Sequence, residues 1–288
     1  MSASFVIKYD GLDATNHTID MRKFGEAIVG LDKVINNGLI AISEYRIPKK
    51  GERFPLRIHA QEPKKGSFEV AGEIANDIAP VGATVLPLVH EMFYSSASDI
   101  VWRWVSWVLN MSGGREKEAD PHFVALLELT KEIHRGRTDD SDANRKFLLD
   151  VLDRVAAPAK GIVAPVGTSA DTVTVAPSRG RMAEEKTTID EAMADAIRSK
   201  ERLVVGDMET FTVSVDGFSH DSRTLKIANP DAPEKFMTAS VRDPAFTDGD
   251  NVYTRAAANR SQLIVSAKPS RSKDGTLRKL YILDAEEA

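Results

Sequence analysis

Histidine is the residue type in this sequence best suited to metal binding or proton transfer, because its ring nitrogens ligate cations and titrate near neutral pH. A helical metal site needs two such side chains three or four residues apart. The six histidines lie far apart and none has a partner at that spacing: His17, His59, His90, His122, His134 and His220. The chain also has no cysteine, which excludes disulfides, thiolate metal sites and a cysteine nucleophile. We therefore predict no metal, no cofactor and no catalytic residue.

Glycine-rich loops could cradle a phosphate group, but no complete phosphate-binding motif is present. The segments 165–168 (PVGT) and 113–115 (GGR) lack both the Walker spacing and its terminal Lys-Ser/Thr pair. The acidic segment 139–142 (DDSD) lacks the spaced oxygens, central glycine and terminal glutamate of a calcium loop. We interpret it as a solvated helix entry.

The most distinctive local pattern is the segment 63–69, PKKGSFE. One interpretation is a hairpin turn, in which proline and glycine set the bend and lysine keeps it solvated. The alternative is a basic anion contact, in which Lys64 and Lys65 act together with Lys49 and Lys50. Exposed lysines on turns are common, so both interpretations stay open.

The order of elements resembles that of a known group of proteins. A strand ending in YDG (9–11) precedes a glycine-containing helix, FGEAIVGLDKVIN (24–36), then a strand, and then a turn and strand reading KKGSFEV (64–70). With the hydrophobic helical segment and β-rich tail that follow, this resembles a family of uncharacterised bacterial proteins, some of them encoded in mobile or defence-related gene neighbourhoods. The resemblance implies a bacterial setting, defence-associated for some members, and supplies no activity and no catalytic residues.

Residues 79–111 hold all three tryptophans and the densest apolar run of the chain. Such a segment must be covered by a core, a partner chain or a membrane. Pro80 and Pro87 break its first part, and Glu91, Asp99 and Arg103 interrupt the rest, so a membrane span of about 20 apolar residues is not expected. Conditional contact with a membrane surface stays open.

We expect two helices here, over 85–94 and 98–111. Trp102 and Trp104 project about 200° apart on a helix, at about 100° per residue, so they cannot share one face. We therefore predict that a core covers one face and a second chain covers the other. The expected interface residues of this homo-oligomer, or of a complex with another protein, are Trp102, Trp104, Trp107, Phe93 and Tyr94.

Composition and patterning predict an α+β protein. Of the 288 residues, 42% are hydrophobic, and the net charge of -5 is spread along the chain, so a nucleic-acid partner is not expected and a cytoplasmic location is. We expect an N-terminal antiparallel sheet with one long helix over 21–45, a central helical region with a helical hairpin over 121–155, and a small C-terminal β-barrel or sandwich. The expected domains are 1–160, a linker region with a short strand and helix over 161–200, and an all-β domain over 201–288.

Three classes of function fit these features. The first, which we favour, is a non-enzymatic interaction or assembly protein of a bacterial multi-component system, in which anti-phage defence is one possibility. The second is a membrane-acting effector that uses residues 79–111. The third is a nucleotide-sensing or enzymatic protein whose site is assembled from residues dispersed in the sequence.

Overall fold

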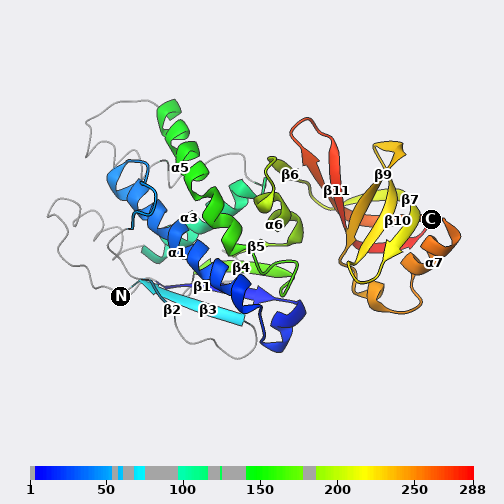
Figure 1. The fold of residues 1–288 in the computed structure, drawn as a ribbon. Coiled ribbons are helices and arrows are strands. Elements are labelled where there is room, and N and C mark those ends of the chain that lie inside the picture. The colour runs from blue at the N-terminus through cyan, green and yellow to red at the C-terminus, as the bar shows by residue number, and fades with distance from the viewer. Residues whose placement is uncertain are drawn as a thin grey trace. The chain divides into compact units, whose positions relative to one another are not determined.

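The computed structural model describes residues 4–53, 58–60, 68–74, 97–115, 124, 141–177 and 186–288 (Figure 1). The chain divides into two compact units, Met1–Arg198 and Ser199–Ala288. The first contains an antiparallel sheet with helices, and the second contains a closed β-barrel. The predicted α+β class is therefore confirmed, and the C-terminal part is a barrel rather than a sandwich.

Five antiparallel strands form the N-terminal sheet, in the order β2-β3-β1-β4-β5. Their bounds are β1 Ser4–Asp10, β2 Ile58–Ala60, β3 Phe68–Ile74, β4 Thr172–Pro177 and β5 Thr187–Ile189. The central strand β1 is buried, and the hydroxyl of Tyr9 donates a hydrogen bond of 2.9 Å to the backbone carbonyl of Ile162. Burial raises the pKa of Tyr9 far above its usual range, so this hydroxyl stays a donor.

Helices accompany this sheet: α1 Met21–Glu44, α3 Ala97–Ser112, α5 Ser141–Ile162 and α6 Glu191–Arg198. The long helix α1 begins as predicted, because the carboxylate of Asp20 accepts a hydrogen bond of 2.8 Å from the backbone N–H of Lys23. α1 contacts both α3 and α5, and it runs beside α5 in Figure 1. The predicted helices over 85–94 and 121–135 lie outside the described residues, apart from Val124.

Two glycines let α1 and α5 approach at backbone distance. A Cβ added to Gly30 of α1 would lie 2.5 Å from the carbonyl oxygen of Pro158, and one added to Gly161 of α5 would lie 2.7 Å from that of Glu26. Real Cβ atoms do not come this close to backbone oxygens. Gly30 and Gly161 therefore allow these two helices to pack with their backbones in contact.

The segment 161–200, predicted to be a linker region with a short strand and helix, belongs up to Arg198 to the N-terminal unit. β4 pairs with the central strand β1, and β5 pairs with β4. The segment 156–162 completes α5, with Pro158 inside the helix, although its alanine, proline and glycine content suggested a linker. Burial of Ala159 and Ile162 stabilises this turn of the helix against its unfavourable composition.

Strand β5, Thr187–Ile189, ends directly before α6. The carboxylate of Asp190 accepts a hydrogen bond of 3.0 Å from the backbone N–H of Met193 and so caps the helix. The tertiary pairing of β5 with β4 therefore decides where the helix begins.

Five strands of the C-terminal unit close into a barrel in the order β7-β8-β9-β11-β10, and β10 returns to pair with β7. The strands are β7 Glu209–Ser219, β8 Thr224–Asn229, β9 Ala232–Val241, β10 Gln262–Ser272 and β11 Leu277–Glu287. A short strand, β6 Leu203–Val205, pairs with the end of β10. β9 and β11 are parallel, whereas the other neighbours are antiparallel.

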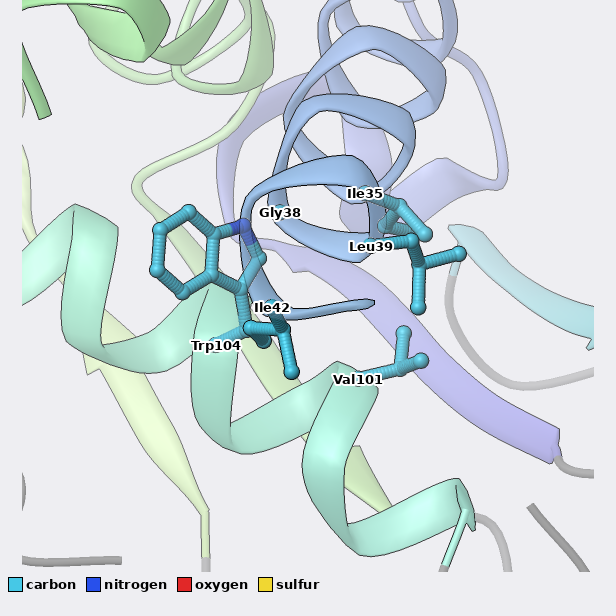
Figure 2. A pocket seen from close by; sticks show the side chains of 6 residues that line it. All are labelled: Ile35, Gly38, Leu39, Ile42, Val101 and Trp104. Atoms are coloured by element: carbon cyan, nitrogen blue, oxygen red, sulfur yellow. The ribbon is translucent and has the colours of Figure 1, made fainter. Parts of the chain in front are cut away.

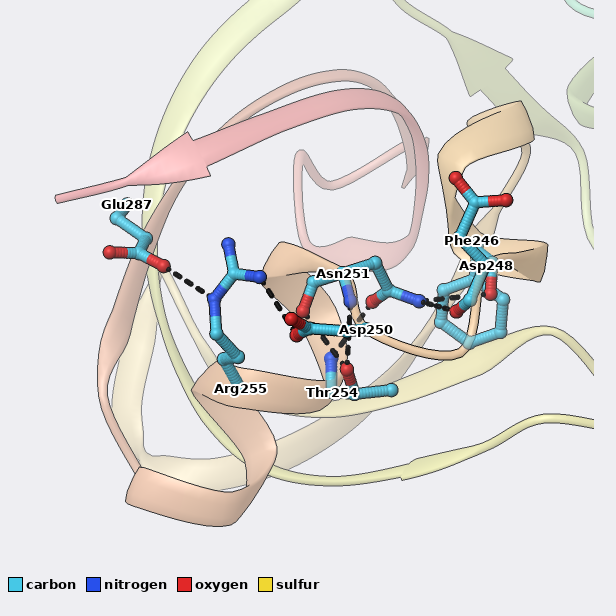
Figure 3. A network of polar contacts seen from close by, with 7 residues as sticks. All are labelled: Phe246, Asp248, Asp250, Asn251, Thr254, Arg255 and Glu287. Atoms are coloured by element: carbon cyan, nitrogen blue, oxygen red, sulfur yellow. Dashed lines mark hydrogen bonds and ion pairs between the residues drawn. The ribbon is translucent and has the colours of Figure 1, made fainter.

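Alternating side chains fill the barrel, as the strand patterns predicted. Leu225 and Ile227 of β8, for example, are fully buried beside inward-facing residues of β7 and β10. Helix α7 Val252–Asn259 lies between β9 and β10 in the chain and starts with a capping box formed by Asn251 and Thr254 (Figure 3). Arg255 on its first turns bridges Asp250 and Glu287, at 2.9 Å and 3.0 Å, and so joins α7 to the end of β11.

Replacing Gly30 by alanine tests the close approach of α1 to α5. The added methyl group meets the Pro158 carbonyl, so we expect a loss of about 1–3 kcal/mol in the free energy of unfolding. Denaturation followed by tryptophan fluorescence reports on the N-terminal unit alone, because all three tryptophans lie in it. The matched control is Gly25→Ala on the same helix, where a Cβ meets nothing within 4 Å. This control should stabilise the unit by up to about 1 kcal/mol, and an equal gain at Gly30 would contradict the packing argument.

Candidate functional site

The three tryptophans of α3 are core residues of the N-terminal unit. Their exposed fractions are 7% for Trp102, 2% for Trp104 and 3% for Trp107. α3 contacts α1, α5 and α6 as well as strands β1, β4 and β5, so elements of this one chain lie against several sides of the helix. The expected cover by a second chain is therefore not needed at these side chains. A homo-oligomer stays a prediction and would have to use other surface.

Trp104 is held by α1. Its indole N–H donates a hydrogen bond of 2.9 Å to the backbone carbonyl of Val34, and a Cβ added to Gly38 would lie 2.2 Å from the indole nitrogen. Beside this contact, α1 and α3 leave a small hollow lined by apolar side chains and Gly38: Ile35, Gly38, Leu39, Ile42, Val101 and Trp104 (Figure 2). The hollow has no room for a water molecule and offers no charged side chain, so it belongs to the core.

Within the part of the chain that the structure describes, no helix is long and apolar enough to cross a membrane. A stable membrane span by α3 is thus not supported. A membrane-acting role would require α3 to leave the core, since its side chains from Val101 to Leu109, Arg103 aside, are buried.

The predicted anion contact is only half described. Lys49 and Lys50 are exposed in the loop after α1, whereas Lys64 and Lys65 lie outside the described residues, as do Phe93 and Tyr94 of the predicted interface. Near Lys49, Glu52 accepts hydrogen bonds from the Lys49 backbone N–H at 2.8 Å and from the Arg46 guanidinium at 2.6 Å. These donors lower the pKa of Glu52 to about 2, so the loop carries a carboxylate that stays charged. Joint action of the four lysines stays a prediction.

The described histidines occupy separate places. His17 is the left-handed residue that ends the short 3-10 helix Leu12–Asn16, His59 is exposed on β2, and His220 stacks on Phe246 with ring centroids 6.1 Å apart. His90, His122 and His134 lie outside the described residues. Among the residues that are described, no three histidine, aspartate or glutamate side chains gather as they would around a metal ion.

The barrel carries the exposed groups that sequence reasoning missed. On β8 and β9, the side chains that point away from the core include Lys226, Ala228, Phe236 and Thr238, which we call the β8–β9 face. Glu234, two residues before Phe236 on β9, is exposed as well. Phe236 is 56% exposed, an unusual placement for a phenylalanine in a well-packed barrel. Lys226 lies with its ammonium 4.7 Å from the centre of the Phe236 ring and also pairs with Asp216 of β7. An aromatic ring and a cation are thus presented side by side.

The two ends of this face are set by strand direction. Because β9 and β11 are parallel, the turn before β9 and the loop 273–276 before β11 share one end of the barrel. Arg271 of β10 confirms this, since its guanidinium pairs with Asp231 of that turn and donates to the carbonyl of Gly275 at 3.0 Å. Lys235 and Lys273 are exposed at the same end. The loop 220–223 lies at the opposite end, where the Val241 N–H donates to the Arg223 carbonyl at 2.8 Å.

The sequence did contain a signal for Phe236. In the predicted strand over 235–242, the apolar series Met237, Ala239 and Val241 marks the inward side, which places Phe236 on the other side. Its pairing with Lys226 could not be foreseen, because a register between two strands is not written in either of them.

The fold defines a two-unit α+β protein whose barrel exposes an aromatic ring beside a lysine. Residues 5–198 match the family model DUF7946, described as a domain of unknown function, and residues 207–286 match DUF7947, described as a family of unknown function. The chain belongs to the DUF7946 family, which confirms the expected uncharacterised family. The comparisons with curated proteins and with solved structures give no match.

The loop 273–276 offers a pH test of the site's geometry. The carboxylate of Asp274 accepts hydrogen bonds from the Ser272 hydroxyl at 2.6 Å and from the Thr276 N–H at 3.1 Å, which lower its pKa to about 2. Because the folded pKa lies below the ordinary value of 3.8, these bonds stabilise the loop above about pH 4 and are lost as the pH falls toward 2. NMR titration of the side-chain carboxyl should show this midpoint.

Ser272→Ala should raise the pKa of Asp274 toward its ordinary value, because it removes the hydroxyl hydrogen bond that lowers this pKa most. Ser222→Ala, in the loop at the other end of the barrel, is the control and should leave it unchanged. An unshifted pKa in Ser272→Ala would mean that the hydroxyl does not hold the carboxylate.

Proposed function

We propose that this chain is a non-enzymatic recognition protein, in which the N-terminal unit is a packed scaffold and the barrel carries the recognition surface. The observation that carries the proposal is the exposed Phe236 beside Lys226 on the β8–β9 face. Leaving an aromatic ring in water has no benefit for the barrel's own stability. Aromatic rings with cations beside them are instead typical of surfaces that bind other molecules.

The topology of the barrel supports the same place for the surface. Taken in chain order, its strands close as first-second-third-fifth-fourth, the third and fifth are parallel, and a helix lies between the third and fourth. This arrangement corresponds to the OB-fold, which binds extended ligands on its second and third strands and on the loops after its first and fourth strands. Those parts here are β8, β9 and the loops 220–223 and 273–276. The fold suggests where a ligand binds, and the residues must supply the chemistry.

Arg198 of the N-terminal unit holds the backbone of its own unit, which supports a scaffold role. The guanidinium of Arg198 donates to the backbone carbonyls of Val163 and Val166 and pairs with Asp195 at 3.1 Å. It thereby fixes the turns that lead from α5 into β4. A homo-oligomer, a protein partner and a defence-related setting stay predictions alongside this proposal.

Site-specific photo-crosslinking tests the proposed surface without knowledge of the ligand. We would place p-benzoylphenylalanine at position 236 in the full chain and irradiate bacteria that produce it. We expect a covalent adduct, because this ring would contact the bound molecule. Sensitivity of the adduct to nuclease, protease or glycosidase then gives its class.

The matched control carries the same photoreactive residue at position 283. Leu283 is 36% exposed on β11, a strand that does not pair with β8. Adducts at 236 and none at 283 would support the proposal. Adducts of equal yield at both positions, or none at 236, would overturn it.

A further inference from the structure

We infer that the β8–β9 face binds single-stranded nucleic acid, with a base stacked on Phe236 and backbone phosphates held by lysines around it. This inference rests on the proposed function, because it names the ligand class of the same face. Proteins that bind single strands without sequence preference combine aromatic rings that stack bases with cations that follow the backbone.

The stacking requirement is met by one ring. Phe236 is 56% exposed although Lys226 already lies beside it, so ring surface remains accessible to a base. Its cross-strand partner is Ala228, whose small side chain leaves space next to the ring. A second aromatic, Phe218 of β7, is 45% exposed but does not belong to this face, because it pairs with the inward-facing Leu225 and its ring lies 6.4 Å from that of Phe246. Bases have a π-face whatever their identity, so such contacts would be tolerant of sequence.

The cation requirement is met by three lysines. Lys226 lies on the face itself, and Lys235 and Lys273 are exposed at the end of the barrel shared by the turn before β9 and the loop 273–276. Asp231 pairs with Arg271 and Asp274 accepts two hydrogen bonds within its loop, whereas Glu234, next to Lys235 on β9, is an exposed acid beside this face. Phosphates complement these lysines, whereas an uncharged oligosaccharide would use only the ring. The lysines therefore favour nucleic acid over an uncharged oligosaccharide as the ligand.

From the net charge of the whole chain we did not expect a nucleic-acid partner, whereas this inference concerns the charge of a single face. A net charge of -5 averages over every face of the chain, whereas a strand of nucleic acid contacts one face only. The balance also limits the strength of binding. Residues 199–288 contain 14 acidic and 13 basic side chains, so we expect affinity in the micromolar range with a modest dependence on salt.

Asp216 supplies a test that separates binding from structure. Its carboxylate pairs with Lys226, and this contact lowers the pKa of Asp216, so the acid stays charged and competes with a phosphate for the lysine. Asp216→Asn frees Lys226. If Lys226 contacts phosphate, the variant should bind single strands more tightly, whereas a purely structural ion pair would give unchanged or weaker binding.

The experiment uses the full chain and fluorescein-labelled 20-mers of oligo-dT and oligo-rU, with a 20-base-pair DNA duplex for comparison, followed by fluorescence anisotropy at 50 mM salt. We expect both single strands to bind more tightly than the duplex, and their relative affinities distinguish DNA from RNA as the preferred ligand. With three lysines contacting phosphates, the logarithm of affinity should fall with the logarithm of salt with a slope of about -2.

Variants locate the binding. Phe236→Ala should weaken binding by about 5- to 100-fold, the effect typical of removing one stacking ring. Asp216→Asn should tighten it by about two- to five-fold, since an exposed ion pair is worth that much. Leu283→Ala on β11 is the matched control and should bind as the wild type does. Phe236 is exposed, so its removal leaves the barrel folded, which circular dichroism verifies.

The results would distinguish this inference from the proposed function. Absence of binding up to about 100 µM chain, equal binding of the duplex, or an unchanged affinity in Phe236→Ala would overturn the inference. If crosslinking at position 236 nevertheless yields a protein or glycan adduct, the proposed function stands and only the ligand class is wrong. If crosslinking yields no adduct there either, both fall.

Discussion

The packing of the N-terminal unit depends on two glycines of α1, whose missing side chains leave space for neighbouring elements. Gly30 admits the backbone of α5, and Gly38 admits the indole ring of Trp104 from α3. At each glycine a neighbouring element fills the space that a side chain would occupy, so α1, α3 and α5 cannot separate without opening voids. The hydrogen bond from Trp104 to the Val34 carbonyl adds direction to a contact that packing alone would leave free to slide.

The second constraint is closure of the barrel. β10 pairs with β7 on one side and with β11 on the other, and its register with β11 is irregular between Ser266 and Ala267 and between Ser270 and Arg271. Closure removes free edges among the barrel strands, so the surface available for recognition is made of side chains rather than of unpaired backbone. Recognition by the barrel therefore depends on the few outward side chains of β8 and β9.

The tryptophan-rich segment shows how a correct local inference can lead to a wrong global one. Trp102 and Trp104 do project to different sides of α3, as the helical period requires. The expectation of a second chain assumed that one core covers one side only. In the folded unit α3 contacts helices and strands on several sides, so this chain covers both rings. The number of neighbours of a helix is a property of the whole unit, and the helix's own sequence does not contain it.

Features that depend on short stretches were predictable. The period of α1 and its Asp20 cap follow from side-chain spacing and from one local hydrogen bond, and the strands of the last third follow from alternation between turns. Features that depend on distant residues were not. The stretch 156–162 has the composition of a linker and is helical because Ala159 and Ile162 are buried by the rest of the unit.

The sequence by itself determined where the long helix α1 lies, that the last third is rich in strands, and that it contains no recognised catalytic or phosphate-binding motif. Only the tertiary structure decided which strand pairs with which, that the β-rich tail closes into a barrel, and that Phe236 meets Lys226 on its outside. The physical reason is range. Helix period, caps and strand alternation act over a few residues, whereas register, closure and burial are settled by contacts between segments far apart in the chain.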